Sequence, residues 1–141
     1  MKIERENFRR LSAWKAKSDR KPLILQGARQ IGKTWIIKTF GERSFTDTAY
    51  FNFDKNDELQ QLFEGTKEVE RLLGKLAVYT KSPIKPQSTL IIFDEIQECN
   101  KALNSLKYFS LTLFLHKLFC NSLIFKILNC RLFTFVININ Q

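Results

Sequence analysis

The sequence predicts an α/β domain in which helices flank a parallel β-sheet. Three short runs rich in apolar or aromatic residues, at 22–26, 48–54 and 89–95, have the length and composition of buried strands. Between them lie segments whose apolar residues recur at the spacing of an amphipathic helix. With 141 residues, of which 44% are hydrophobic, the chain is long enough to form one domain around a core.

The first part of the chain is predicted to form a helix, a strand and a second helix. Residues 4–17 place apolar side chains on one helical face, with basic residues around them, and the apolar ones are Phe8, Leu11 and Trp14. The run PLILQ, residues 22–26, is typical of a buried parallel strand. Residues 33–40 favour a helix, and we expect Gly41 to end it as a C-terminal cap.

The middle of the chain predicts a second strand and two more helices. Residues 48–54, TAYFNFD, combine β-branched and aromatic residues, which favour a strand. Asn56 is a suitable N-cap for a short helix that Gly65 would end. Thr66 is the predicted cap of the following helix, whose apolar face consists of Val69, Leu72, Leu73 and Leu76.

A third strand and one further helix follow. TLIIFDE, residues 89–95, places four apolar residues before two acids, and Asn100 to Phe109 has the spacing of a helix. Because strands alternate with helices along the chain, the strands are expected to be parallel.

The stretch GARQIGKT, residues 27–34, joins the first strand to its helix and fits G-x-x-x-x-G-K-[ST], the pattern of a phosphate-binding loop. Gly27 and Gly32 allow backbone turns that a side chain would block, so that N–H groups can surround a phosphate. Lys33 would place a positive charge on the β- and γ-phosphates, and Thr34 would offer a hydroxyl to Mg²⁺. The remaining loop residues are Ala28, Arg29, Gln30 and Ile31. The alternative is a plain glycine turn between a strand and a helix.

Two acids end the third strand, at the edge of the sheet where the loop also lies. Asp94 can hold a Mg²⁺ that bridges phosphates, and Glu95 can polarise an attacking water as a general base. An apolar run that ends in Asp-Glu is weak evidence alone, because many strands end in exposed acids. Together with the loop, it predicts a nucleotide site. Arg29 and Gln97 are lesser candidates, each of which either contacts the nucleotide or faces solvent.

Three stretches resemble the prokaryotic AAA+-like P-loop ATPases of the AAA_14/DUF4143 type: RKPLILQGARQIGKTWIIKTFGE, AYFNFDKNDELQQLFEG and STLIIFDEIQECNKALNSLKYF. The resemblance covers about residues 3–109. It implies a P-loop NTPase-like sheet that binds ATP with Mg²⁺ and an ancestral activity of ATP hydrolysis. It also implies that Lys33 and Thr34 act in the loop. By the same resemblance, Asp94 binds the metal and Glu95 is the base.

Residues 110–141 depart from this resemblance, because they contain no Gly, Ala, Pro, Asp or Glu. We interpret residues 1–109 as the N-terminal part of a P-loop ATPase domain. The tail from 110 to 141 is interpreted as the product of a frameshift or truncation, which makes the fold incomplete. The resemblance implies a further strand, carrying a polar sensor residue, between the first and third strands, and an arginine finger that we cannot identify. Without that strand, two inner edges would stay unpaired and nucleotide binding and turnover would be impaired. LFTFVI, residues 132–137, is a strand-like candidate for the vacant place.

The charge leaves two alternatives open. A net charge of +9 and a pI of about 9.6 are compatible with a nucleic-acid-binding module. The apolar tail with its scattered basic residues is compatible with a membrane-surface or interaction protein. Those basic residues interrupt every apolar span, so no transmembrane segment is expected. The three cysteines lack the spacing of a zinc site, and the charged start is unlike a signal peptide, so the expected location is the cytoplasm.

Overall fold

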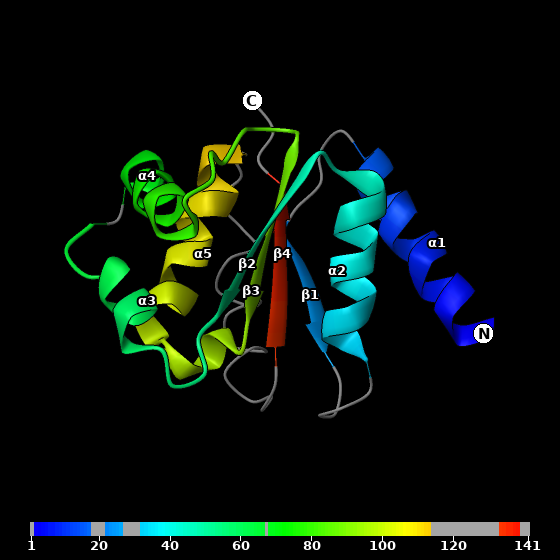
Figure 1. Cartoon of the computed structure of the whole chain (residues 1–141), viewed down its shortest axis with the longest axis horizontal. Coiled ribbons are helices and arrows are strands. Elements are labelled where there is room, and N and C mark those ends of the chain that lie inside the picture. The colour runs from blue at the N-terminus through cyan, green and yellow to red at the C-terminus, as the bar shows by residue number, and fades with distance from the viewer. Residues whose placement is uncertain (1, 18–21, 27–31, 67, 114–132, 139–141) are drawn as a thin grey trace.

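The computed structural model describes residues 2–17, 22–26, 32–66, 68–113 and 133–138. Its elements form three layers, with a β-sheet between two layers of helices (Figure 1). Helices α1 and α2 cover one face of the sheet, and α3, α4 and α5 cover the other. The arrangement confirms the predicted α/β class with helices on both faces of a sheet.

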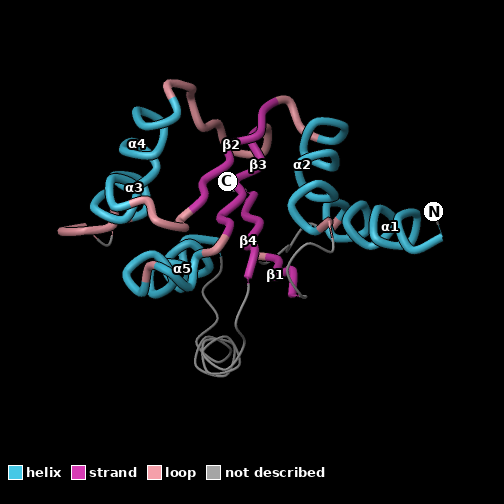
Figure 2. The backbone as a smooth tube through the Cα atoms, turned by 60° about the horizontal axis from the view of Figure 1, so that its bottom comes forward, coloured by secondary structure: helices cyan, strands magenta, loops and turns pink. Residues whose placement is uncertain are grey.

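The described sheet has four strands in the order β1-β4-β3-β2 (Figure 2). In that order they are β1 (Leu23–Gln26), β4 (Phe133–Asn138), β3 (Thr89–Asp94) and β2 (Asp47–Asn52). β2 and β3 are parallel, and their register places Asn52 opposite Asp94. β4 is antiparallel to both of its neighbours, so β1 and β3 run in the same direction. Their carboxyl ends therefore lie at the same edge of the sheet.

Strand β4 occupies the place between β1 and β3 that the sequence left open. Its Thr134 lies opposite Leu25 on one side and opposite Asp94 on the other. The expectation that the facing edges of β1 and β3 would stay unpaired is therefore wrong. The expectation that LFTFVI supplies a strand between them is confirmed. Because β4 runs antiparallel to both of its neighbours, the sheet is mixed, and the expected parallel direction holds for β1, β2 and β3 only. An antiparallel strand can pair its N–H and C=O groups with both neighbours as fully as a parallel one.

Helices α1 (Lys2–Ala16) and α2 (Lys33–Ser44) pack on one sheet face. Their contacts with β3 form a buried apolar cluster of Leu11, Trp14, Ile37, Phe40, Leu90 and Ile92. The predicted helix end at Gly41 is wrong, because α2 continues for three residues beyond it. Gly41 lies close to β2, and a Cβ atom there would lie 2.5 Å from Oγ1 of Thr48. A glycine at this position permits close packing and does not act as a cap.

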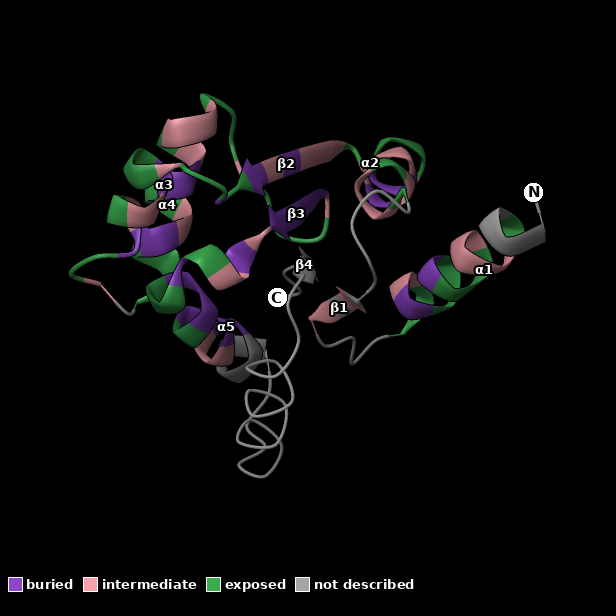
Figure 3. Ribbon diagram, turned by 90° about the horizontal axis from the view of Figure 1, so that it is seen from below, coloured by how far each residue is buried: buried purple, intermediate pink, exposed green. Residues whose placement is uncertain are grey.

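The opposite face carries α3 (Asp57–Leu62), α4 (Val69–Thr80), the 3₁₀ helix η1 (Ile96–Glu98) and α5 (Asn100–Leu113). Their buried faces turn toward the sheet (Figure 3). Phe93 of β3 lies among four aromatic rings at centroid distances of 5.6 to 6.2 Å, those of Phe51, Phe53, Phe63 and Phe109. Every residue of β3 is buried, so this strand holds its last residue, Asp94, in a well-packed frame.

The two predicted N-caps have different outcomes. The N–H of Leu59 donates to Oδ1 of Asn56 at 3.0 Å, which confirms Asn56 as the cap of α3. The prediction for Thr66 is wrong, because α4 begins two residues later, after Glu68. Thr66 Oγ1 instead accepts the Glu68 N–H at 3.2 Å within the preceding turn.

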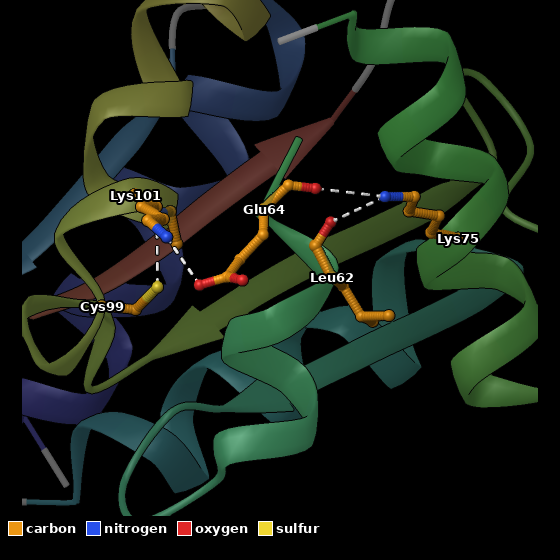
Figure 4. Close-up of polar contacts among 6 residues, drawn as sticks. Leu62, Glu64, Lys75, Cys99 and Lys101 are labelled. Carbon is orange, nitrogen blue, oxygen red and sulfur yellow. Dashed lines mark hydrogen bonds and ion pairs between the residues drawn. The ribbon is translucent and has the colours of Figure 1, made fainter. Parts of the chain in front are cut away.

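The turn after α3 is tied to α4 and α5 by two lysines (Figure 4). Nζ of Lys75 donates to the carbonyl oxygens of Leu62 at 3.3 Å and Glu64 at 3.4 Å, near the end of α3. Nζ of Lys101 pairs with Oε1 of Glu64 at 2.6 Å, and this hydrogen bond lowers the pKa of the Glu64 carboxyl below its ordinary value. The turn is therefore fixed to two helices that follow it in the chain.

Candidate functional site

The predicted site lies at one edge of the sheet, where β1 and β3 end and α2 begins (the lower edge in Figure 1). Gly27 to Ile31, the first five residues of the predicted phosphate loop, lie outside the described residues. Gly32, Lys33 and Thr34 are described, and so are Asp94 and Glu95. The site can therefore be built from the end of the loop and the end of β3.

Gly32 forms the N-cap of α2 in a left-handed conformation, with φ 80° and ψ 14°. A Cβ atom there would meet no other atom within 4 Å, so a side chain would fit. Glycine suits this position because it adopts the left-handed conformation without strain. Its carbonyl oxygen accepts the N–H of Ile36 at 3.0 Å and starts the helix. The N–H groups of the first turn of α2 thereby point out of the N-terminal end of the helix.

Thr34 and Asp94 are 60 residues apart in the chain but meet at this edge. Oγ1 of Thr34 donates to Oδ2 of Asp94 at 2.9 Å. Asp94 is only 6% exposed, because β3 is covered on both faces and ends in the core. The structure thus brings together the two residues that the sequence assigned to the metal.

Tyr50 is part of the same site and was missed by the sequence reasoning. Its hydroxyl donates to Oδ2 of Asp94 at 2.8 Å, so this oxygen accepts hydrogen bonds from both Thr34 and Tyr50. Burial of the ring raises the pKa of the Tyr50 hydroxyl well above its ordinary value, and the hydrogen bond to the Asp94 carboxylate raises it further. Nζ of Lys38, one turn after Thr34 on α2, lies 3.5 Å from the centroid of the Tyr50 ring.

Strand register explains why Tyr50 reaches Asp94. Asn52 lies opposite Asp94, and Tyr50 precedes Asn52 by two residues, so both side chains project from the same face of β2. This is the face that α2 covers, since Tyr50 packs on the apolar cluster beneath α1 and α2. The alternation of side chains along TAYFNFD could have predicted which face of the strand Tyr50 lies on. It could not have predicted that Tyr50 contacts Asp94 on another strand.

Glu95 follows β3 in a left-handed backbone conformation, with φ 53° and ψ 35°. The turn separates its side chain from the buried strand, and the residue is partly exposed. Nε2 of Gln97 donates to Oε2 of Glu95. Gln97, a lesser candidate from the sequence, is thus placed beside the predicted base, whereas Arg29 lies outside the described residues.

The oxygens of Thr34 and Asp94 form a donor pair that fits a magnesium ion. In an octahedral shell with bonds of 2.0–2.1 Å, neighbouring oxygens lie about 2.9 Å apart. The separation of Thr34 Oγ1 and Asp94 Oδ2 is 2.9 Å, so both could bind one ion without backbone movement. In the described part of the chain there is no group of three or more His, Cys, Asp or Glu side chains placed to hold a metal. Water and phosphate oxygens would have to complete the shell.

The described structure can also be compared with the expectations for a transmembrane segment and for the tail. No helix among the described residues is both long and apolar enough to cross a bilayer. Most of the tail, including His116 and residues 114–132, lies outside the described residues.

Comparison with protein-family models matches residues 19–127 to the AAA domain family. The matched region includes the whole predicted loop and also Asp94 and Glu95 at the end of β3. It extends past Phe109, where the resemblance noted from the sequence stops. Comparison with curated proteins gives no match, and comparison with solved structures gives none either. Since the family model spans more than half of the chain, this protein belongs to the AAA domain family, as the resemblance in its sequence implied.

Proposed function

We propose that this chain binds ATP together with Mg²⁺ and that its ancestral reaction is hydrolysis of the γ-phosphate. The observation that carries the proposal is the hydrogen bond between Thr34 and Asp94, which joins the end of the phosphate loop to the end of β3. A glycine turn without a ligand would not require a buried carboxylate at this place. Membership of the AAA domain family supports nucleotide binding at a coarser level.

The proposed binding mode divides the nucleotide between two groups of residues. Backbone N–H groups of the loop and the start of α2 surround the phosphates, and Lys33 neutralises their charge. Thr34 and Asp94 hold the magnesium ion, which would neutralise charge on the β- and γ-phosphates when bound. Because Asp94 is buried and already oriented by two hydrogen bonds, little reorganisation is needed on binding.

Glu95 is the proposed general base. It follows Asp94 directly, so it lies next to the γ-phosphate end of the proposed nucleotide and could orient a water for attack. The water would transfer its proton to the Glu95 carboxylate as its oxygen bonds to phosphorus and the bond to ADP breaks. Gln97 holds one carboxylate oxygen of Glu95 and limits its freedom. We expect turnover to be slow, because the sequence identifies no arginine finger to stabilise the developing charge.

We also propose that the chain divides at residue 109. Residues 1–109 would be the N-terminal part of a P-loop ATPase domain and supply the binding residues, and residues 110–141 would be an apolar tail produced by a frameshift or truncation. β4 of that tail pairs with both β1 and β3, so the tail contributes to the sheet whatever its origin.

The test is a thermal unfolding scan of the full chain with and without Mg-ATP, alongside Lys33→Ala. At an ATP concentration 100 times the dissociation constant, binding would add about 2.7 kcal/mol. For a chain of this size that corresponds to an increase in the midpoint of roughly 5–15 °C. We expect Lys33→Ala to remove the increase, because Lys33 contacts the phosphates. An unchanged Mg-ATP shift in Lys33→Ala, or no shift in the unmodified protein, would refute the proposal.

A further inference from the structure

Two described side chains of different kinds donate hydrogen bonds to the Asp94 carboxylate. Thr34 lies at the start of α2 and is itself a proposed metal ligand, whereas Tyr50 lies on β2 and has no role in the phosphate loop. Both donate to Oδ2, at 2.9 Å and 2.8 Å. A carboxylate oxygen has two lone pairs in the plane of the group, so these two donors use both of them.

This arrangement changes when a cation is bound by Thr34 and Asp94. The Thr34 oxygen would direct a lone pair to the ion, so its proton can no longer point at Oδ2. The Oδ2 lone pair that accepted the Thr34 hydrogen bond becomes available to the ion. The second Oδ2 lone pair keeps its hydrogen bond from Tyr50. Of these two donors, Tyr50 is therefore the one that can hold the carboxylate in both states.

We propose that Tyr50 is a positioning residue that fixes the orientation of Asp94 and thereby sets the affinity of the site for Mg²⁺. This inference rests on the proposed function and deepens it, because it assigns the metal dependence of binding to a residue outside the loop and the acid strand. Hydrogen-bond partners of metal ligands commonly orient the ligand and tune its affinity.

Three features keep Tyr50 in place. Its backbone belongs to β2, whose register with β3 runs from Asp47 opposite Thr89 to Asn52 opposite Asp94. Its ring packs on the apolar cluster beneath α2. Nζ of Lys38 lies 3.5 Å from the ring centroid and covers the ring from the side of α2. The β2 backbone, the apolar cluster and the Lys38 ammonium group thus fix the position of the ring and keep its hydroxyl beside Asp94.

The test is the Mg²⁺ dependence of ATP binding to the full chain, measured by calorimetry with Tyr50→Phe. This substitution removes the hydroxyl and keeps the ring. We expect the Mg²⁺ concentration for half-maximal binding to rise roughly 10- to 100-fold. The affinity for ATP in excess EDTA should stay unchanged, because Tyr50 contacts no phosphate in this proposal. A loss of affinity that is equal with and without Mg²⁺ would show a merely structural role and overturn the inference.

Tyr79→Phe is the matched control, because it also removes a hydrogen-bonded tyrosine hydroxyl. That hydroxyl accepts a hydrogen bond from Nδ2 of Asn56 at 3.0 Å, and Tyr79 packs on the apolar cluster at the opposite face of the sheet from Tyr50. Tyr79→Phe should leave the Mg²⁺ requirement as it is in the unmodified protein. An equal increase in both variants would contradict the inference.

Lys38→Met keeps the inference testable if Tyr50→Phe does not fold. It removes the ammonium group over the ring from a partly exposed helical position. We expect a smaller increase in the Mg²⁺ requirement, roughly two- to fivefold, since the ring is less firmly held. No increase would overturn the inference. If the unmodified chain binds no ATP at all, the proposed function itself fails. If Tyr50→Phe binds ATP with the same Mg²⁺ dependence as the unmodified chain, only the inference about Tyr50 is refuted, and the proposed function stands.

Discussion

Gly41 provides a quantitative test of how closely α2 packs on the sheet. A Cβ atom at this position would lie 2.5 Å from Oγ1 and 3.0 Å from Cγ2 of Thr48, and 3.2 Å from Cδ2 of Leu90. Thr48 is β-branched and lies on a strand, so rotation about χ1 exchanges one close atom for the other. Gly41→Ala should gain about 1 kcal/mol of helix propensity but lose about 1–3 kcal/mol by overpacking. We therefore expect a net destabilisation of about 1 kcal/mol.

Gly74→Ala is the matched control for this prediction. Gly74 lies inside α4 and is exposed, and a Cβ atom there would meet nothing within 4 Å. The same substitution should therefore stabilise the protein by about 1 kcal/mol at this site. Urea unfolding followed by circular dichroism gives both free energies, provided that the m-values agree.

A double-mutant cycle tests whether the contact with Thr48 causes the destabilisation by Gly41→Ala. Thr48→Ala removes the two nearest atoms and leaves only the 3.2 Å contact with Leu90. In that background, Gly41→Ala should cost at least about 1 kcal/mol less than in the unmodified chain. If Gly41→Ala alone stabilises the protein as much as Gly74→Ala does, the close approach of α2 to β2 is refuted.

Two further predictions concern the opposite face of the sheet. Phe93→Ala should lower the free energy of unfolding by about 3–5 kcal/mol, because the ring is fully buried among four other aromatic rings; a loss below about 1 kcal/mol in urea unfolding would contradict the described packing. A carboxyl NMR titration should give Glu64 a pKa below its ordinary value, which Lys101→Met should bring back toward that value. Because the folded-state pKa is the lower one, the stabilisation by this pair is present above the unfolded-state pKa and is lost as pH falls through the folded-state pKa. An unchanged Glu64 titration in Lys101→Met would refute this assignment.

The elements that the sequence predicted correctly depend on local patterns. The run LIIF is apolar on both faces of a strand, and β3 is buried throughout. Asn56 caps α3 because its side chain reaches an N–H only three residues away. In the same way, the loop motif predicted that α2 begins at Lys33. Such features need no knowledge of distant contacts.

The features that the sequence did not predict depend on contacts between distant elements. Gly41 looked like a helix end, but its role follows from Thr48 on the next strand. Tyr50 contacts Asp94, 44 residues later, through the register of two strands, and no pattern within TAYFNFD specifies that register. The composition of LFTFVI indicated a strand, but its direction is set by how the chain reaches β1 and β3, which periodicity does not encode.

The position of β4 has a consequence for the order in which the protein can fold. In the described sheet, β1 pairs with β4, and the register joins Leu23 to Val136. A ribosome that adds roughly 5–20 residues per second needs roughly 5–20 s to proceed from β1 to β4. Until then β1 has no partner in the described sheet and one edge of β3 stays open, so both edges can pair with other chains while synthesis continues. Thr34 and Asp94, made much earlier, thus acquire their final framework only when residue 138 has left the ribosome.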